Sequence, residues 1–341
     1  MNQRIVIPEP GKVVIEDAPM PEPRENEALV KVLYGGICGS DLGTYRGTFA
    51  YVAYPRIPGH ELAVEVAEAP ENELGIAKGL LATLNPYFNC GKCRPCRLGR
   101  PNCCVDNQTL GAQRDGGFVK FFAIPLDRLY PSRGLGVGET ALVEPFCISY
   151  HGVKRAGLRP GEKVLVIGAG TIGVLAMLAA RHFGAEAYVT DVAPGKLAHA
   201  EKLGAAGTFV NSSRRALGEW TERVTSGEGF AATIEAVGLP STFVDAVDAA
   251  ASAGRVVVIG VSKQNAPDFN FTAIQKKELA IFGSRNALRR DFSEVVDLML
   301  ASGFSAEKLV SAVYDFADAS AAFRDFSEKA GEMLKVLIRF S

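Results

Sequence analysis

The apolar and polar positions of the chain show two successive patterns. In the first third, short β-branched runs are interrupted repeatedly by proline and glycine. Residues 28–41 (ALVKVLYGGICGSD) predict a strand that runs into a glycine-rich turn, and residues 61–69 (ELAVEVAEA) predict another strand. Short strands with this punctuation are typical of a β-rich, barrel-like domain.

The pattern changes near Glu144. Residues 162–205 predict a strand, a tight glycine turn, a helix, a second strand ending at Asp191 and a helix from about Lys196 to Leu203. Further on, strands at 232–237, 255–261 and 278–284 alternate with a predicted helix over 241–254. Apolar strands that alternate with helices indicate a parallel sheet covered on both faces. A helix over 292–303 and a strand over 335–340 follow, and spacing alone leaves open whether they form a third unit or rejoin the first.

Composition narrows the class of protein. A chain of 341 residues favours roughly two domains. Hydrophobic residues make up 48% and charged residues 22%, which excludes a disordered chain. The 37 basic and 38 acidic side chains give a net charge of -1, so no basic surplus favours nucleic acid or an anionic membrane as a partner.

Two further observations concern location and the cysteines. The longest dense apolar stretch, residues 172–180, is shorter than the ~20 residues of a spanning helix, and the N-terminus lacks a secretory apolar segment. We therefore expect a cytoplasmic protein. Seven cysteines are then an improbable disulfide framework, and five of them lie between positions 90 and 104, which points to a metal.

Residues 168–173 (GAGTIG) form a G-x-G-x-x-G turn that follows a buried strand and opens an apolar helix. Gly168 makes the turn, Gly170 admits a pyrophosphate, and Gly173 allows close packing of helix and strand. The unpaired N–H groups of the helix N-terminus favour the phosphate charge. With Asp191 about twenty residues later, this is the full context of a dinucleotide fingerprint.

Asp191 can accept hydrogen bonds from ribose hydroxyls and repels a 2′-phosphate, so the sequence favours NAD over NADP. The other reading is a βαβ unit with structural glycines. The further candidate cofactor contacts are Thr171, Ile172, Lys196 and Gly260.

Two sets of residues carry metal-binding chemistry. Cys90, Cys93, Cys96 and Cys104 are separated by two, two and seven residues, which suits a closed tetrahedral zinc site. Cys103 is adjacent to Cys104, and the two side chains cannot easily face one metal ion; the choice of Cys104 rests on the family resemblance given below. The second set comprises Cys38 (in GICGSD), His60 and Glu61 (in PGHE) and Glu144 (in VEP). Three protein ligands plus water form the open pattern of a catalytic zinc.

Taken together, these residues resemble the zinc-dependent medium-chain dehydrogenases/reductases of the sorbitol/threonine dehydrogenase type. The segments that carry the resemblance span most of the chain in the family's order: GICGSD, PGHE, NPYFNCGKCRPCRLGRPNCC, DGGF, VEP and GAGTIG. A narrower likeness, to bacterial sugar-acid and polyol dehydrogenases and notably those acting on L-galactonate, lies in GRPNCC, VEPFCIS and KKELAIFGSRNA.

The resemblance implies an α/β fold with a GroES-like β-rich catalytic domain (1–148), a Rossmann doubly wound parallel sheet (149–284) and a C-terminal part (285–341) that returns to the catalytic domain. It implies two zinc ions per chain. Cys38, His60 and a carboxylate, Glu61 or Glu144, match the catalytic zinc site, while Cys90, Cys93, Cys96 and Cys104 match the structural one. It also suggests a homo-oligomer, a dimer or tetramer.

The expected reaction is oxidation of a secondary alcohol with hydride transfer to NAD. Ser40 is placed to take the alcohol proton, and Asp41 is expected to accept a hydrogen bond from the ring of His60. Glu61 is either a ligand or a carboxylate that exchanges with water. Many relatives carry a relay histidine where this chain has Gly43, so a relay from Ser40 must use a ribose hydroxyl, water or another side chain.

The substrate is a small molecule, expected to be a hexonate such as L-galactonate or L-gulonate. Polyols of the sorbitol or galactitol type and L-threonine-type amino alcohols are the alternatives. Arg114 and Arg285 are candidate partners of a substrate carboxylate, and Tyr45 is a candidate pocket residue. A zinc-stabilised NAD-binding scaffold or redox sensor without turnover is the non-enzymatic alternative. A zinc-free reductase of the same superfamily is disfavoured by the two metal sets and Asp191.

Overall fold

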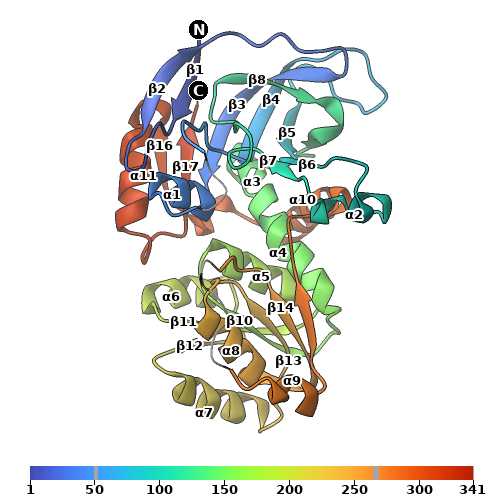
Figure 1. Cartoon of the computed structure of the whole chain (residues 1–341), viewed down its shortest axis with the longest axis vertical. Coiled ribbons are helices and arrows are strands. Elements are labelled where there is room, and N and C mark those ends of the chain that lie inside the picture. Colours follow the sequence, from blue (N-terminus) through green and yellow to red (C-terminus); the bar gives the residue numbers. More distant parts are fainter. Residues whose placement is uncertain (50–52, 263, 265–268, 341) are drawn as a thin grey trace. The chain divides into compact units, whose positions relative to one another are not determined.

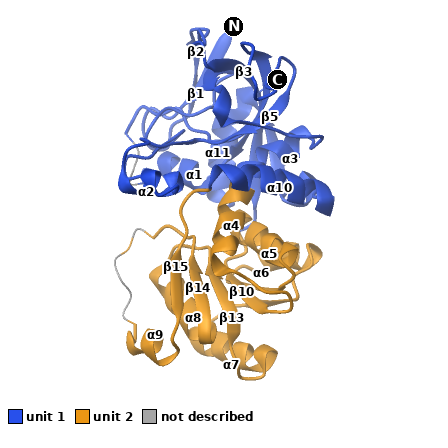
Figure 2. Ribbon diagram, turned by 90° about the vertical axis from the view of Figure 1, so that its right-hand side faces the viewer, with its two compact units in different colours: residues 1–144, 288–341 blue, residues 145–287 orange. Residues whose placement is uncertain are grey.

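The computed structural model describes residues 1–49, 53–262, 264 and 269–340. They form two compact units, which Figure 2 colours separately. The first unit comprises residues 1–144 and 288–341, and the second comprises residues 145–287. Among the described residues, no helix is long and apolar enough to cross a membrane.

The first unit is rich in short strands (Figure 1). Its strands are β1 (Asn2–Val6), β2 (Val14–Ala18), β3 (Glu27–Ile37), β4 (Glu61–Glu68), β5 (Leu81–Leu84), β6 (Tyr87–Phe88), β7 (Gln108–Thr109), β8 (Phe121–Pro125), β9 (Leu129–Pro131), β16 (Val310–Asp315) and β17 (Lys335–Arg339). Its helices are α1 (Gly39–Tyr45), α2 (Arg94–Arg97), α3 (Val137–Ala141), α10 (Arg289–Ser302) and α11 (Ala319–Glu328), with four 3₁₀ turns, η1 (Pro101–Cys103), η2 (Leu126–Arg128), η3 (Ala306–Lys308) and η4 (Phe316–Asp318). Helix α4 (Val143–Ala156) begins in this unit and continues into the second.

One seven-stranded sheet organises the first unit. Its strand order is β16-β17-β3-β4-β5-β9, and β8 also pairs with β3. The C-terminal strand β17 pairs antiparallel with β3, and Val336 lies opposite Ile37. This pairing joins residues near the two ends of the sequence. Phe118, Phe323 and Phe340 are buried in the core cluster of this unit. The sheet therefore fixes the C-terminal strand beside the residues that follow β3.

The second unit alternates strands and helices. Its strands are β10 (Lys163–Ile167), β11 (Glu186–Asp191), β12 (Gly207–Val210), β13 (Phe230–Glu235), β14 (Ala250–Val258) and β15 (Ala280–Gly283). Its helices are the greater part of α4, α5 (Thr171–His182), α6 (Pro194–Lys202), α7 (Arg214–Thr225), α8 (Pro240–Ala249) and α9 (Thr272–Lys276).

The six strands form a parallel sheet in the order β12-β11-β10-β13-β14-β15. The order reverses between β10 and β13, and ligands of such sheets bind at the carboxyl ends of the strands beside this point. Helix α5 packs against β10 and β11, and α8 packs against β13 and β14. The predicted fold class, a β-rich domain joined to a doubly wound parallel sheet, is confirmed.

One predicted element is wrong in extent. The sequence predicted a helix over 241–254, but α8 ends at Ala249 and β14 begins at Ala250. Within β14, Ala253 adopts the left-handed region at φ 58°, and the pairing of β13 with β14 shifts register between Phe230 and Ala232. Small alanines gave no periodic signal for the helix end.

Candidate metal and nucleotide sites

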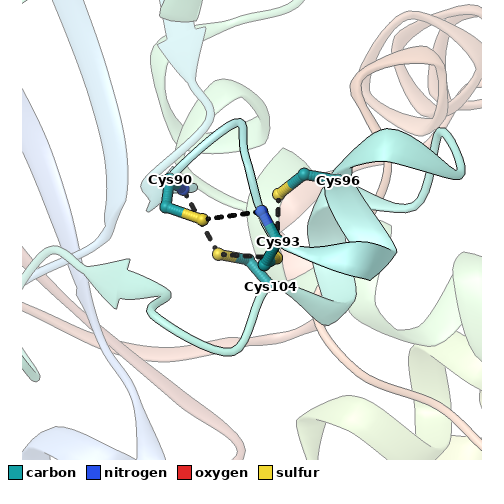
Figure 3. Close-up of side chains that lie close together, drawn as sticks. All are labelled: Cys90, Cys93, Cys96 and Cys104. Carbon is teal, nitrogen blue, oxygen red and sulfur yellow. Dashed lines mark hydrogen bonds between the residues drawn. The ribbon is translucent and has the colours of Figure 1, made fainter.

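Four cysteine side chains converge in the first unit (Figure 3). Cys90 follows β6, Cys93 precedes α2, Cys96 lies in α2, and Cys104 follows η1. Their sulfur atoms all lie within 4.8 Å of one another, and Cys93 Sγ is 3.4 Å from Cys96 Sγ and 3.8 Å from Cys104 Sγ. Four thiolates at about 2.3 Å from a zinc ion stand about 3.8 Å apart. The donor set therefore fits a closed zinc site.

Backbone N–H groups of residues 90–104, called the lobe below, donate hydrogen bonds to these sulfur atoms. The N–H of Cys90 donates to Cys104 Sγ at 3.2 Å, and the N–H of Cys93 donates to Cys90 Sγ at 3.4 Å. Backbone hydrogen bonds from Cys96 and Val105 lower the pKa of Cys93 to about 6, whereas burial raises the pKa of Cys104 to about 11. Binding of a metal would thus release a proton from Cys104. Cys103 does not belong to this converging set of described residues.

A second set, of different chemistry, meets at the end of β3. Cys38 directly follows β3 and caps α1, while His60 and Glu61 stand at the start of the neighbouring strand β4. One donor atom from each of Cys38, His60 and Glu61 lies within 4.8 Å of the other two. His60 is 6% exposed and Glu61 1% exposed. The pairing of β3 with β4 brings this trio together although the sequence separates Cys38 from His60.

His60 retains an unsatisfied polar atom in this setting, because its buried Nδ1 has no hydrogen-bond partner. A buried polar group without a partner is costly. Because Nδ1 lies 3.9 Å from Asp41 Oδ1, the other ring nitrogen, which interacts with Cys38, is the one available to a metal ion at the trio. Burial lowers the pKa of His60, but the charges of Asp41 and Cys38 outweigh this and raise the pKa well above its usual value. Thiolate, imidazole and carboxylate together are a zinc-binding donor set, and the trio fits that metal.

The hydrogen bond expected between Asp41 and the His60 ring is absent. Asp41 Oδ1 lies 3.9 Å from His60 Nδ1, beyond hydrogen-bond distance. Asp41 instead accepts the backbone N–H of Cys38 at 2.9 Å and that of Gly59 at 3.2 Å. As the third residue of α1, it is bound to its own helix start and fixes the loop that carries His60.

No pattern along the chain indicates the partner of Glu61. Lys335, the first residue of β17, donates from Nζ to Glu61 Oε1 at 2.7 Å and also to Ile37 O at 3.2 Å. Both side chains are buried. The two positions are 274 residues apart, so only the pairing of β17 with β3 could reveal the contact.

Glu144 lies near this trio but outside it. Its carboxylate accepts a hydrogen bond from the Tyr87 hydroxyl, and it is 2% exposed. Burial raises its pKa to about 7, against the lowering influence of His60, while Glu61 adds to the rise. Of the two candidate carboxylates, the structure therefore groups Glu61, not Glu144, with Cys38 and His60.

Of the remaining candidates, Ser40 and Tyr45 share helix α1, whereas Arg114 and Arg285 lie outside the helices and strands. Ser40 is half-buried in the first turn of α1, next to Cys38. Tyr45, at the end of α1, packs its ring 5.8 Å from that of Phe323. Arg114 is exposed, with its guanidinium 4.0 Å from the ring centre of Phe88. Arg285 is exposed and lies in the second unit, two residues after β15.

The glycine turn of the second unit is built for close backbone approach. Gly168 has φ 103°, and a Cβ at Gly173 would lie 1.8 Å from the carbonyl oxygen of Gly168. At Gly170, the N-cap of α5, a Cβ would meet nothing within 4 Å. No side chain caps this helix, whose first turn begins with Thr171 and Ile172. The open space before its N–H groups fits a pyrophosphate.

Asp191 ends β11 beside this turn. Its Oδ2 accepts the N–H of Ala169 at 2.7 Å and its Oδ1 accepts the N–H of Ala193 at 2.9 Å. Each carboxylate oxygen keeps a second lone pair for a ribose hydroxyl. Lys196 is half-buried in the first turn of α6. The turn and Asp191 therefore meet at the carboxyl ends of β10 and β11, as the fingerprint requires.

Glu235 is a buried acid at this edge of the sheet that the sequence analysis missed. At the end of β13, its Oε1 accepts the N–H groups of Val237 and Gly238 at 2.9 and 2.8 Å. A Cβ at Gly260 would lie 2.2 Å from Gly238 N and 2.5 Å from Glu235 Oε2. Gly260 therefore permits packing of the loop after β13, which itself lies against Gly168.

Two family models match the chain. The alcohol dehydrogenase GroES-like domain matches residues 24–134, and the zinc-binding dehydrogenase model matches residues 171–301. Together they cover more than half of the chain, and the protein belongs to the zinc-type medium-chain alcohol dehydrogenases, oxidoreductases that act on CH–OH groups.

Particular relatives extend over almost the full length. The chain is 32% identical to L-galactonate-5-dehydrogenase of Escherichia coli (strain K12) over 98% of both chains. It is 30% identical to a sorbitol dehydrogenase of Bacillus subtilis (strain 168), over 96% of this chain and 94% of that one. The crystal structure of the alcohol dehydrogenase rspB from E. coli CFT073, complexed with NADH, matches with a TM-score of 0.90, 30% identity and 99% coverage of both chains.

Proposed function

We propose that the chain is a zinc-dependent, NAD-linked dehydrogenase that oxidises a secondary alcohol of a sugar acid or polyol, with L-galactonate as the first candidate substrate. The observation that carries the proposal is the trio of Cys38, His60 and Glu61, in which a half-buried thiol meets a buried imidazole and a buried carboxylate. The similarity to L-galactonate-5-dehydrogenase and to a sorbitol dehydrogenase supports the substrate class.

The metal and nucleotide sites assign a role to each group of residues in this reaction. Cys38, His60 and a carboxylate would hold the catalytic zinc, and the four cysteines of the lobe would hold the structural one. Zinc bound at the trio supplies a Lewis acid that lowers the pKa of an alcohol hydroxyl. NAD bound at the glycine turn would supply the hydride acceptor, and Asp191 would accept hydrogen bonds from its ribose.

The alcohol proton requires an acceptor on the protein. Ser40 is the candidate, because it stands two residues beyond Cys38 on a helix whose start Asp41 fixes. The chain beyond it carries no histidine at Gly43, where a Cβ would already lie 3.2 Å from the Cβ of Phe49. A relay from Ser40 would therefore use a ribose hydroxyl, water or another side chain.

Arginine would distinguish an acid substrate from a neutral one. Arg114 and Arg285 are both exposed and offer charge-assisted hydrogen bonds to a carboxylate. If either binds the substrate, its replacement by methionine weakens binding of L-galactonate by about 10- to 100-fold, the value of a hydrogen bond to a charged group. The same replacement should leave the rate on sorbitol unchanged, because sorbitol has no carboxylate.

The test follows NADH absorbance over L-galactonate, L-gulonate, sorbitol, galactitol and L-threonine. The proposal predicts turnover with NAD on a hexonate or a polyol, and the Arg114→Met and Arg285→Met variants then separate these two classes. Arg215→Met on α7, where the side chain is 90% exposed, is the control for loss of a surface charge. Zinc-loaded protein without turnover on any secondary alcohol would contradict the proposal.

A further inference from the structure

Three arginine side chains of the first unit meet around Phe88, at the end of strand β6. The guanidinium carbon of Arg114 lies 4.0 Å from the centre of the Phe88 ring, and that of Arg128 lies 4.7 Å from the same point. An aromatic face attracts a guanidinium, so Phe88 holds both cations close together. Arg289 reaches the neighbouring residue, because it donates to the carbonyl oxygen of Asp127 at 3.1 Å and also to the Asp127 carboxylate.

The charges of this group do not balance. Asp127 is shared by Arg289 and by Arg128, whose Nε lies 3.7 Å from the carboxylate. Burial lowers the pKa of Arg128, and the positive charges of Arg289 and Arg114 add to the lowering, whereas Asp127 opposes it. In the described part of the chain, no other carboxylate lies within ion-pair distance of the three arginines. Three cations therefore share one acid.

Arg114 also has unused hydrogen-bond donors. A guanidinium carries five N–H donors, and no described residue accepts a hydrogen bond from that of Arg114. The acid beside it in sequence, Asp115, pairs instead with Arg56 at 3.1 Å. Arg114 is exposed, and the side chains of Arg289 and Asp127 are half-exposed, so an ion from solvent can reach the group.

The N-terminus of α10 adds to the positive potential. Arg289 and Arg290 are the first two residues of this 14-residue helix, and both are exposed. The N-terminal end of a helix carries a partial positive charge, where acids are favourable and arginines are not. The acid of this turn, Asp291, is buried and accepts the backbone N–H of Leu288. Residues that break a local rule in this way are expected at functional sites.

We propose that Arg114, Arg128 and Arg289 form a binding site for an oxyanion, the group that carboxylates and phosphates share. The planar guanidinium offers paired N–H donors that match two oxygens of such a group. A bound anion supplies the counter-charge that Asp127 alone does not, and it competes with Asp127 for Arg289. The inference does not depend on the metal site, although the proposed function also names Arg114 as a candidate partner of the substrate carboxylate.

Calorimetric titration of the zinc-loaded full chain with sulfate, at an ionic strength held constant with chloride, measures this binding. We expect the wild type to bind one sulfate per chain, and Arg114→Met and Arg289→Met each to bind it at least about tenfold more weakly. Arg324→Met is the matched control, because Arg324 lies in the first unit, pairs with an aspartate and is 56% exposed, against 52% for Arg289. It should bind sulfate within about twofold of wild type.

Asp127→Asn should change the affinity in the opposite direction. The amide keeps the shape of the side chain but removes the charge that competes for Arg289, so sulfate should bind at least about threefold more tightly. General damage to the fold would weaken binding instead. The inference is overturned by a wild type that binds no sulfate, by Arg114→Met and Arg289→Met variants that match the control, or by an Asp127→Asn variant that binds no more tightly than wild type.

Inhibition of turnover by sulfate then distinguishes two sources of the oxyanion. If the site takes the carboxylate of the substrate, sulfate competes with L-galactonate but not with sorbitol, and Arg289→Met abolishes the competition. If the site takes free phosphate, sulfate and inorganic phosphate bind without competing with either substrate. Competition with both substrates that survives in Arg289→Met would place the sulfate at the metal site and overturn the inference. The calorimetric titration requires no turnover, so it decides the inference even if the proposed function fails.

Discussion

The glycine turn of the second unit allows two neighbouring substitutions to be predicted with opposite consequences. A Cβ at Gly173 would lie 1.8 Å from the carbonyl oxygen of Gly168, a distance that real Cβ atoms essentially never show. The contact is with backbone, so helix α5 or the end of strand β10 must move. At Gly170, three residues earlier, a Cβ would meet no protein atom within 4 Å.

These distances set the expected magnitudes. Gly173→Ala should destabilise the fold by about 1–3 kcal/mol, the usual cost of overpacking. Gly170→Ala should cost at most about 1 kcal/mol, since its φ of -72° suits alanine and only the weaker N-cap preference is lost. Its methyl group would, however, occupy the space before the N-terminus of α5. We therefore expect Gly170→Ala to bind NADH at least tenfold more weakly, which corresponds to about 1.4 kcal/mol.

Thermal unfolding and fluorescence titration with NADH measure the two quantities separately. The structure predicts that Gly173→Ala loses stability and that Gly170→Ala loses NADH affinity while its melting temperature stays close to wild type. If Gly170→Ala bound NADH as tightly as wild type, the pyrophosphate would not approach this turn. If Gly173→Ala melted like wild type, the close packing of turn and helix would be wrong.

Three further predictions concern stability, the metal lobe and the cofactor. Hydrogen bonds from the Arg255 side chain and the Arg159 backbone N–H outweigh burial and lower the pKa of Glu162. Glu162→Gln should therefore cost about 1 kcal/mol at neutral pH, and unfolding by denaturant should show this difference vanish as the pH falls through the lowered pKa. Cys96→Ser should lose one zinc ion per chain, measured by elemental analysis, and should melt at a lower temperature. A variant with full zinc content would show that the four cysteines do not hold a zinc ion. Asp191→Ala should raise the KM for NAD about tenfold or more and reduce the preference over NADP, and unchanged kinetics with both cofactors would refute its proposed role.

The sites that the sequence predicted are each formed by residues that lie close together along the chain. The four cysteines of the lobe lie within one short segment, and the glycine turn, its helix and Asp191 lie within one βαβ unit. Their chemistry depends on spacing along the chain, which a single sequence displays. The helix end at Ala249 was missed because a run of small residues carries neither a periodic pattern nor a cap.

Contacts between residues on different strands leave no spacing pattern in a single sequence. Lys335 reaches Glu61 only because β17 lies beside β3, and Tyr87 reaches Glu144 from 57 residues away. Asp41 was expected to bind the His60 ring, but backbone N–H groups of its own loop and helix supply its hydrogen bonds. Composition and spacing show which residue types are present, whereas strand order decides which of them meet.

Zinc content and NADH formation, measured together in wild type and Cys38→Ser, decide whether an open metal site at Cys38 and His60 drives alcohol oxidation. We expect two zinc ions per chain with turnover in the wild type, and one zinc ion, an intact fold and no turnover in Cys38→Ser. A Cys38→Ser protein that retained both ions and full activity would contradict it.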